Sequence, residues 1–67
     1  MVTVTLYEIM NLIDDLQYIE IVDHESRSVL VSGHVNTVMV PFTRLNDFVK
    51  EIYVDQISEK NGMVIEI

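Results

Sequence analysis

The sequence contains no cysteine and no tryptophan, and it has one proline and two glycines among 67 residues. Without cysteine, neither a disulfide nor a thiolate zinc site can stabilise the domain, so its stability must come from packing or from self-association. The chain also lacks an apolar run of the roughly 18 to 20 residues that a membrane-spanning helix needs. We therefore predict a single soluble domain over residues 1–67, located in the cytoplasm.

Basic residues are scarce, with four lysines and arginines against eleven aspartates and glutamates, for a net charge of −7. The first 26 residues contain no lysine or arginine at all. Their acids are Glu8, Asp14, Asp15, Glu20, Asp23 and Glu25. This distribution repels nucleic acid and anionic membranes and attracts basic surfaces, although acidity can equally serve solubility alone. We predict no direct contact with nucleic acid or membrane.

Side chains suited to catalysis are also few, because the chain has two histidines and no cysteine. No serine lies in a nucleophile-elbow pattern, and Gly33 and Gly62 are isolated, so no phosphate-binding loop is indicated. Residues 23–25 (Asp-His-Glu) are metal-ligand types, but consecutive residues rarely ligate one ion, and this pattern is also typical of a solvated turn. His34 is expected on the polar face of a strand. We predict no enzymatic activity, no cofactor and no metal site.

The strongest local pattern predicts a helix over residues 5–13. Thr5 is a suitable N-cap, and Glu8 three residues later completes a capping box. Asp14 and Asp15 are unfavourable at the negative end of the helix dipole and indicate that the helix stops before them. The apolar face of this helix has the spacing i, i+3, i+4 and i+7 and consists of Leu6, Ile9, Met10 and Ile13.

Residues 17–23 and 28–35 alternate between apolar and polar side chains and predict a β-hairpin around a polar turn. In the first strand Ile19 and Ile21 should point inward. In the second strand Gly33 indicates a bulge or a close approach of another backbone. The second strand should have Val29, Val31 and Val35 on one face and Ser32 and His34 on the other.

Residues 36–47 predict an irregular crossover, in which Pro41 can start a single helical turn and Phe42 and Leu45 should insert into the core. Residues 48–55 and 62–67 form a second hairpin pattern, with turn residues at 58–62 that include Asn-Gly. In its second strand Met63, Ile65 and Ile67 should share one face, opposite Val64 and Glu66. The predicted fold is therefore α+β, with one N-terminal amphipathic helix packed on a four-stranded, mainly antiparallel sheet of two hairpins.

Several segments together carry a family resemblance. They are the helix pattern at 5–13, the Ile-Glu-Ile-Val-Asp strand at 19–23, the strand that contains Gly33, and the closing strands at 49–54 and 64–67. In pattern and size, nearly the whole chain resembles small accessory proteins of phages and prophages in Gram-positive bacteria. The resemblance includes no catalytic signature and transfers no functional residue. It implies a protein that acts in the host cytoplasm by binding a host protein, as anti-CRISPR and other anti-defence inhibitors do.

Our leading sequence-based hypothesis is a small protein-binding module that inhibits a host nuclease or other nucleic-acid-binding defence protein, because carboxylates can take the place of phosphates in a basic channel. The alternative is a structural or regulatory phage protein that acts through homo-oligomerisation, by its sheet edges or by an apolar patch around Tyr18, Val22 and Leu30. Tyrosines suit such interfaces, although they can equally line the rim of the core. The candidate partner-binding residues are Glu8, Asp14, Asp15, Tyr18, Glu20, Asp23 and Glu25.

Overall fold

A computed structural model of the chain describes residues 3–57 and 60–67. Its elements are α1 (Leu6–Leu12), β1 (Tyr18–Val22), β2 (Val29–His34), the 3₁₀ helix η1 (Phe42–Arg44), β3 (Glu51–Ile57) and β4 (Lys60–Glu66). The strands form one sheet in the order β2-β1-β4-β3. The predicted α+β class, with its N-terminal helix and mainly antiparallel sheet, is confirmed. None of the helices within these described residues is both long and apolar enough to cross a membrane.

The two predicted hairpins are joined by a parallel pairing of β1 with β4. β1 pairs antiparallel with β2, and β3 pairs antiparallel with β4. Between the hairpins, β1 and β4 run parallel, with Ile19 opposite Met63 and Val22 opposite Glu66. The N–H of Ile67 donates to the carbonyl of Val22 at 2.9 Å and continues this ladder. β4 is therefore a central strand, which suits the apolar run of Met63, Val64 and Ile65 where it pairs with both neighbours.

Helix α1 begins as its capping residues predict. The Thr5 hydroxyl accepts the N–H of Glu8, and the Glu8 carboxylate accepts the N–H of Thr5, both at 3.2 Å. The helix ends at Leu12, before the two aspartates. Leu6 is fully buried, and the rest of the predicted apolar face packs around it. The local signals for the start, the end and the buried face of this helix are all confirmed.

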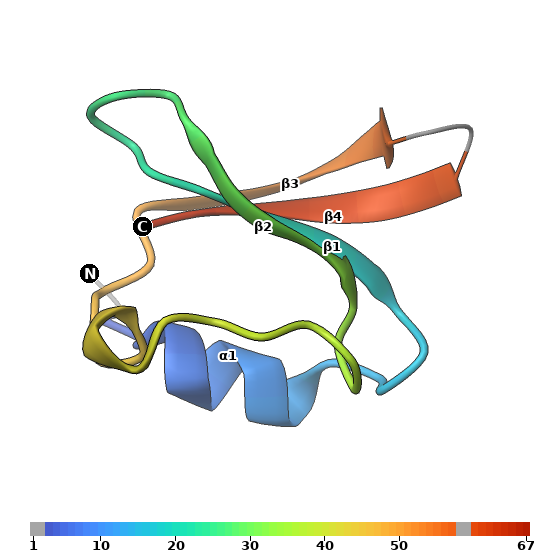
Figure 1. The fold of residues 1–67 in the computed structure, drawn as a ribbon, viewed down its shortest axis with the longest axis horizontal. Helices are drawn as coiled ribbons and strands as arrows, with labels where there is room; N and C mark the ends of the chain where they lie inside the picture. Colours follow the sequence, from blue (N-terminus) through green and yellow to red (C-terminus); the bar gives the residue numbers. More distant parts are fainter. Residues whose placement is uncertain (1–2, 58–59) are drawn as a thin grey trace.

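The core lies between α1 and one face of the sheet. Figure 1 shows the helix and the segment 35–47 on the same side of the sheet, which we call the covered face. The opposite side, the uncovered face, has no layer of this kind over it among the described residues. The core side chains, all at most 1% exposed, are Leu6, Ile19, Ile21, Ile65 and Ile67. The inward positions predicted for β1 are therefore correct, and Ile65 and Ile67, which were predicted to share a face, are both in the core.

The crossover segment differs from its prediction in which side chains it buries. The helical turn after Pro41 is present, but Phe42 is 86% exposed and Leu45 is only half-buried. The prediction that both insert into the core is wrong, because Val38 and Val40 pack against the core instead. The N–H groups of Leu6 and Tyr7 donate to the carbonyls of Asp47 and Leu45, which holds the end of this segment against the start of α1.

Strand β2 also departs from simple alternation. The register of the β1–β2 pair shifts between Ile21 and Val22. As a result Leu30 and Val31 both pack against the core, whereas Val29, which was predicted to share a face with Val31, is 55% exposed. An extra residue at a bulge reverses the face of everything beyond it. The prediction for Val29 is therefore wrong.

The two glycines have roles other than those predicted. Gly33 has a φ of 152°. A Cβ atom at this position would meet the side chains of Thr37 and Val38, both at 3.9 Å, rather than α1. Asn61 and Gly62 lie inside β4, so the prediction that they form the turn is wrong. Residues 58–59, which were also part of the predicted turn, lie outside the described residues.

Candidate functional site

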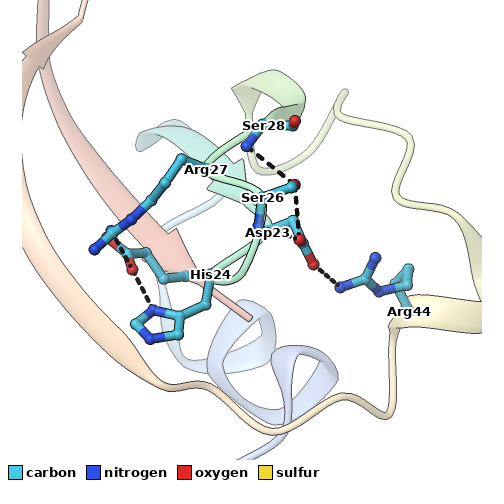
Figure 2. Close-up of polar contacts among 7 residues, drawn as sticks. Asp23, His24, Ser26, Arg27, Ser28 and Arg44 are labelled. Carbon is cyan, nitrogen blue, oxygen red and sulfur yellow. Dashed lines mark hydrogen bonds and ion pairs between the residues drawn. The ribbon is translucent and has the colours of Figure 1, made fainter.

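The turn between β1 and β2 directs adjacent side chains to opposite sides of the sheet. Its backbone is closed by the N–H of Arg27, which donates to the carbonyl of Asp23 at 2.8 Å. Arg27 has a φ of 61°, a left-handed conformation that is uncommon outside glycine. In Figure 2, Asp23 points toward Arg44, whereas His24 and Arg27 lie on the other side of the turn. The turn therefore contributes to two separate ionic clusters.

The first cluster ties the turn to the helix side of the molecule. Arg44 Nη2 contacts Asp23 Oδ1 at 2.8 Å, and Arg44 Nε donates to Asp47. The Ser26 hydroxyl and N–H both donate to Asp23 Oδ2. These contacts, of which the hydrogen bond from Arg44 is the strongest, hold the pKa of Asp23 well below its usual range. Asp23 is therefore occupied by internal contacts, and its role is to anchor the turn.

The second cluster surrounds Glu66 on the uncovered face. The Glu66 side chain is only 1% exposed, yet it is an acid. His24 Nδ1 lies 2.7 Å from Glu66 Oε1, and Arg27 Nη1 lies 3.0 Å from both carboxylate oxygens. The hydrogen bond with His24 lowers the pKa of Glu66 against the opposing effect of burial, and Tyr53 and Arg27 add to this. The hydrogen bond to Glu66 in turn raises the pKa of the Tyr53 hydroxyl.

The backbone around this cluster is fixed at both sides of Glu66. The N–H of Lys50 donates to the carbonyl of Glu66, and the N–H of His24 donates to the carbonyl of Ile67, both at 2.7 Å. The sequence analysis did not select Glu66, Arg27 or Tyr53. A signal for Glu66 was present, because it is the one acid in the apolar run 63–67. An acid inside a central strand needs partners that compensate its burial.

The seven predicted partner-binding residues do not form one surface. Glu8 caps the helix, Asp14 accepts the N–H of Leu16 at 2.8 Å, and both are exposed on the helix side of the sheet. Glu20 follows the alternation of β1 onto the uncovered face. The helix covers only one face, so the strand and helix acids necessarily point apart. Of the remaining residues, Asp15 and Glu25 are exposed, Asp23 is in the Arg44 cluster, and Tyr18 contacts His34.

The uncovered face combines tyrosines with acids. The strand register places Ser32, Glu20, Val64 and Tyr53 in one row across the sheet, with Glu66 beside Glu51 in the next row. Tyr18 and His34 pack edge to face with their ring centroids 5.4 Å apart. Among the described residues, the side chains of Glu20 and Glu51 make no hydrogen bond or ion pair. We call the set Tyr18, Glu20, Glu51 and Tyr53 the acidic sheet face.

An apolar patch around Tyr18, Val22 and Leu30 was the alternative interface. Val22 is only 7% exposed, and Leu30 packs against the core. Exposed apolar side chains lie instead on strand β3, where Ile52 is 40% and Val54 is 74% exposed. The position of the apolar patch is therefore corrected from β1 and β2 to β3.

The residue types that bind metals are also arranged differently from the sequence pattern. Asp23 and His24 join separate ionic clusters and Glu25 is exposed, so the three consecutive residues do not converge on one ion, but the turn is more than a solvated tip. Side-chain ligand atoms of His24, Glu51 and Glu66 instead lie within 4.8 Å of one another.

No family model, no curated protein and no solved structure matches the chain, so its function has to be inferred from its own residues.

Proposed function

We propose that this chain is a non-catalytic protein-binding module that uses its acidic sheet face to bind a basic protein surface. The observation that supports the proposal is the composition of this face. Two tyrosines and two acids stand on the uncovered side of a hydrogen-bonded sheet, and neither acid has an internal partner among the described residues. A rigid strand surface holds these side chains in place, so little conformational entropy is lost on binding.

The charges favour a protein partner over nucleic acid. Arg27 and Arg44 are both held by acids within the chain. Among the side chains that the structure describes, this leaves Lys50 as an exposed base without an acidic partner. A single lysine cannot neutralise a phosphate backbone, whereas acids beside tyrosines complement lysines and arginines on another protein.

The class of partner we propose is a protein whose basic surface normally contacts phosphates. Carboxylates on the acidic sheet face would occupy those basic side chains and exclude the nucleic acid. An anti-CRISPR-like inhibitor from a phage would be one case of this mechanism. That origin and that target remain predictions from the sequence.

The test compares two double charge reversals that change the net charge equally. Glu20→Lys with Glu51→Lys alters the acidic sheet face, and Asp14→Lys with Asp15→Lys alters the end of the helix. Each variant and the native protein are used as bait in host lysate, with mass spectrometry and a salt series as the readout. We expect a basic protein that is retained by the native chain and by the helix variant but lost by the sheet variant.

Two results would contradict the proposal. One is retention of the same protein by the sheet variant, and the other is its loss from the helix variant alone, which would return the interface to the acids beside α1. We expect both variants to fold, because all four positions are exposed or half-exposed. Circular dichroism and thermal unfolding check this.

A second function, self-association, is favoured by a different observation. Strand β3 lies at the edge of the sheet, and both Ile52 and Val54 on it are exposed. Ile52 also lines a shallow hollow of about 300 Å³ together with Val4, Ile9 and Val49. An exposed apolar edge is a template for strand pairing. Sedimentation velocity across a concentration series tests this. A mass that rises with concentration in the native protein and stays monomeric in Val54→Lys supports self-association, and a monomer throughout excludes it.

A further inference from the structure

We propose that His24, Glu51 and Glu66 form a site for a divalent transition metal of the Zn²⁺ type. These residues come from three separate segments, namely the β1–β2 turn, strand β3 and strand β4. Their ligand atoms lie within 4.8 Å of one another. One imidazole and two carboxylates are a donor set that Zn²⁺ accepts, with a fourth position left for water or for a group from a partner.

The geometry requires only small adjustments to hold the ion. Zinc–ligand bonds of about 2.0 to 2.2 Å in a tetrahedral site place ligand atoms roughly 3.4 Å apart. His24 Nδ1 and Glu66 Oε1 are 2.7 Å apart and must separate, while no pair of ligand atoms in the cluster is more than 4.8 Å apart. The side chains that would move are those of His24, which is 39% exposed, and of Glu51, which is exposed. Glu66, on the central strand, stays in place.

Glu66 is already oriented as a metal ligand needs to be. Its backbone is held by the hydrogen bond from Lys50, and its carboxylate is hydrogen-bonded by Tyr53. Outer groups of this kind fix the orientation of ligating carboxylates. Two carboxylates also balance the charge of a divalent cation, so the occupied site would be neutral in a place where Glu66 is shielded from water.

Arg27 is the competitor for this site. Its guanidinium contacts both oxygens of Glu66, but its side chain is 65% exposed. Only the Arg27 end of this pair reaches solvent, so the guanidinium can move into water when another cation takes over the compensation of the buried Glu66 carboxylate. A metal ion would therefore displace Arg27 and supply the positive charge itself. This competition predicts that removing Arg27 strengthens metal binding. If the cluster had only a structural role, removing Arg27 would not produce a tight metal complex.

The experiment uses the untagged protein, because a histidine tag would itself bind zinc. ZnCl₂ alone is titrated by calorimetry, and the two imidazoles are followed by NMR. His34 serves as an internal control, because it lies beside Tyr18 rather than in the cluster. We expect a 1:1 complex in which the signals of His24 shift and those of His34 do not. Arg27→Ala should bind about fivefold more tightly.

The ligand variants complete the test. His24→Ala and Glu51→Gln should each weaken binding by at least about tenfold. Both substitutions alter side chains that reach solvent, so we expect both variants to fold. Glu25→Gln, an exposed acid in the same turn, is the matched control and should bind like the native chain. Equal affinity in the native chain and the ligand variants would overturn the proposal, as would no binding by either the native chain or Arg27→Ala.

Discussion

The two faces of the sheet are buried to a similar degree at their centre but by different means. On the covered face, Ile65 is fully buried beneath α1 and the crossover segment. On the uncovered face, its neighbours Val64 and Glu66 are 3% and 1% exposed without any such layer. There the side chains of Tyr53 and Arg27 lie close to the centre of the face, and long side chains of these types shield what lies beneath them.

The difference separates stability from recognition. The covered face contains interlocking aliphatic side chains, which contribute to folding in proportion to the area they remove from water. The uncovered face contains a buried acid, which costs free energy unless it is fully paired. Buried ionisable groups whose pKa values are shifted by specific partners are more common at functional sites than elsewhere. We therefore expect the largest losses of stability from substitutions in the covered core, and effects on binding from substitutions at the exposed positions of the uncovered face.

The largest expected effect removes both faces together. Deleting residues 63–67 removes most of β4, the strand that connects the two hairpins, and with it the pairings to β1 and to β3. We expect the truncated chain to be unfolded, because neither hairpin alone has a sufficient core. Limited proteolysis and circular dichroism measure this. Protease resistance equal to that of the full chain would contradict the central position of β4.

A pair of neighbouring substitutions on β4 compares the faces directly. Ile65→Ala should lower the free energy of unfolding by about 2 to 5 kcal/mol, because it leaves a cavity in the covered core. Val64→Ala should lower it by about 1 to 2 kcal/mol, because fewer buried carbons are lost. Urea denaturation measures both. If Val64→Ala were the more harmful, the main core would lie on the uncovered face.

The response to acid sharpens the comparison at Glu66. The pKa of this group is lowered in the folded state from its ordinary 4.5, so the folded state favours the charged form. Its contribution to stability is complete above the ordinary pKa and is lost as the pH falls through the lower, folded-state value. We expect Glu66→Gln to be less stable than the native protein above about pH 5, with the difference shrinking as the pH falls.

Thermal unfolding between about pH 2 and 7 provides this measurement, with Glu25→Gln as the control. Glu25 is exposed in the same turn and makes no ion pair with the described residues. A difference between Glu66→Gln and the native protein that did not change with pH would show that the variant acts through packing rather than through charge.

The smallest expected effect concerns the layer that distinguishes the faces. Thr5→Ala removes the hydroxyl that accepts the N–H of Glu8. It should destabilise the protein by about 1 kcal/mol, because one N–H at the start of the helix loses its partner. Thr5→Ser keeps the hydroxyl and should be close to neutral. Chemical denaturation compares the two, and equal stabilities would indicate that the capping box is replaced by water without loss.

Local patterns predicted much of this fold. The capping box at Thr5 and Glu8, the end of the helix before Asp14, and the inward face of β1 all depend on residues within one turn or one strand. Such features follow from hydrogen-bonding capacity and side-chain periodicity, which the sequence displays directly. The polar turn after β1 and the helical turn after Pro41 belong to the same class.

The candidate site was predicted only in part. Glu20 and Tyr18 were selected and do lie on the uncovered face, but Glu8 and Asp14 lie at the helix and Asp23 is paired with Arg44. Alternation placed Glu66 beside Val64, yet no local rule shows that this second face is buried. The bulge that exposes Val29 was equally invisible, because it depends on how β2 meets its neighbour.

The sequence by itself determined where the helix starts and stops, where the four strand segments lie, and which side chains of β1 point inward, because these follow from short-range spacing. Only the tertiary structure decided that β4 lies between β1 and β3, and that His24, Arg27 and Tyr53 meet Glu66. These contacts join residues about forty positions apart, or strands paired across the sheet. Such pairings are set by the packing of the whole domain, which no local pattern contains.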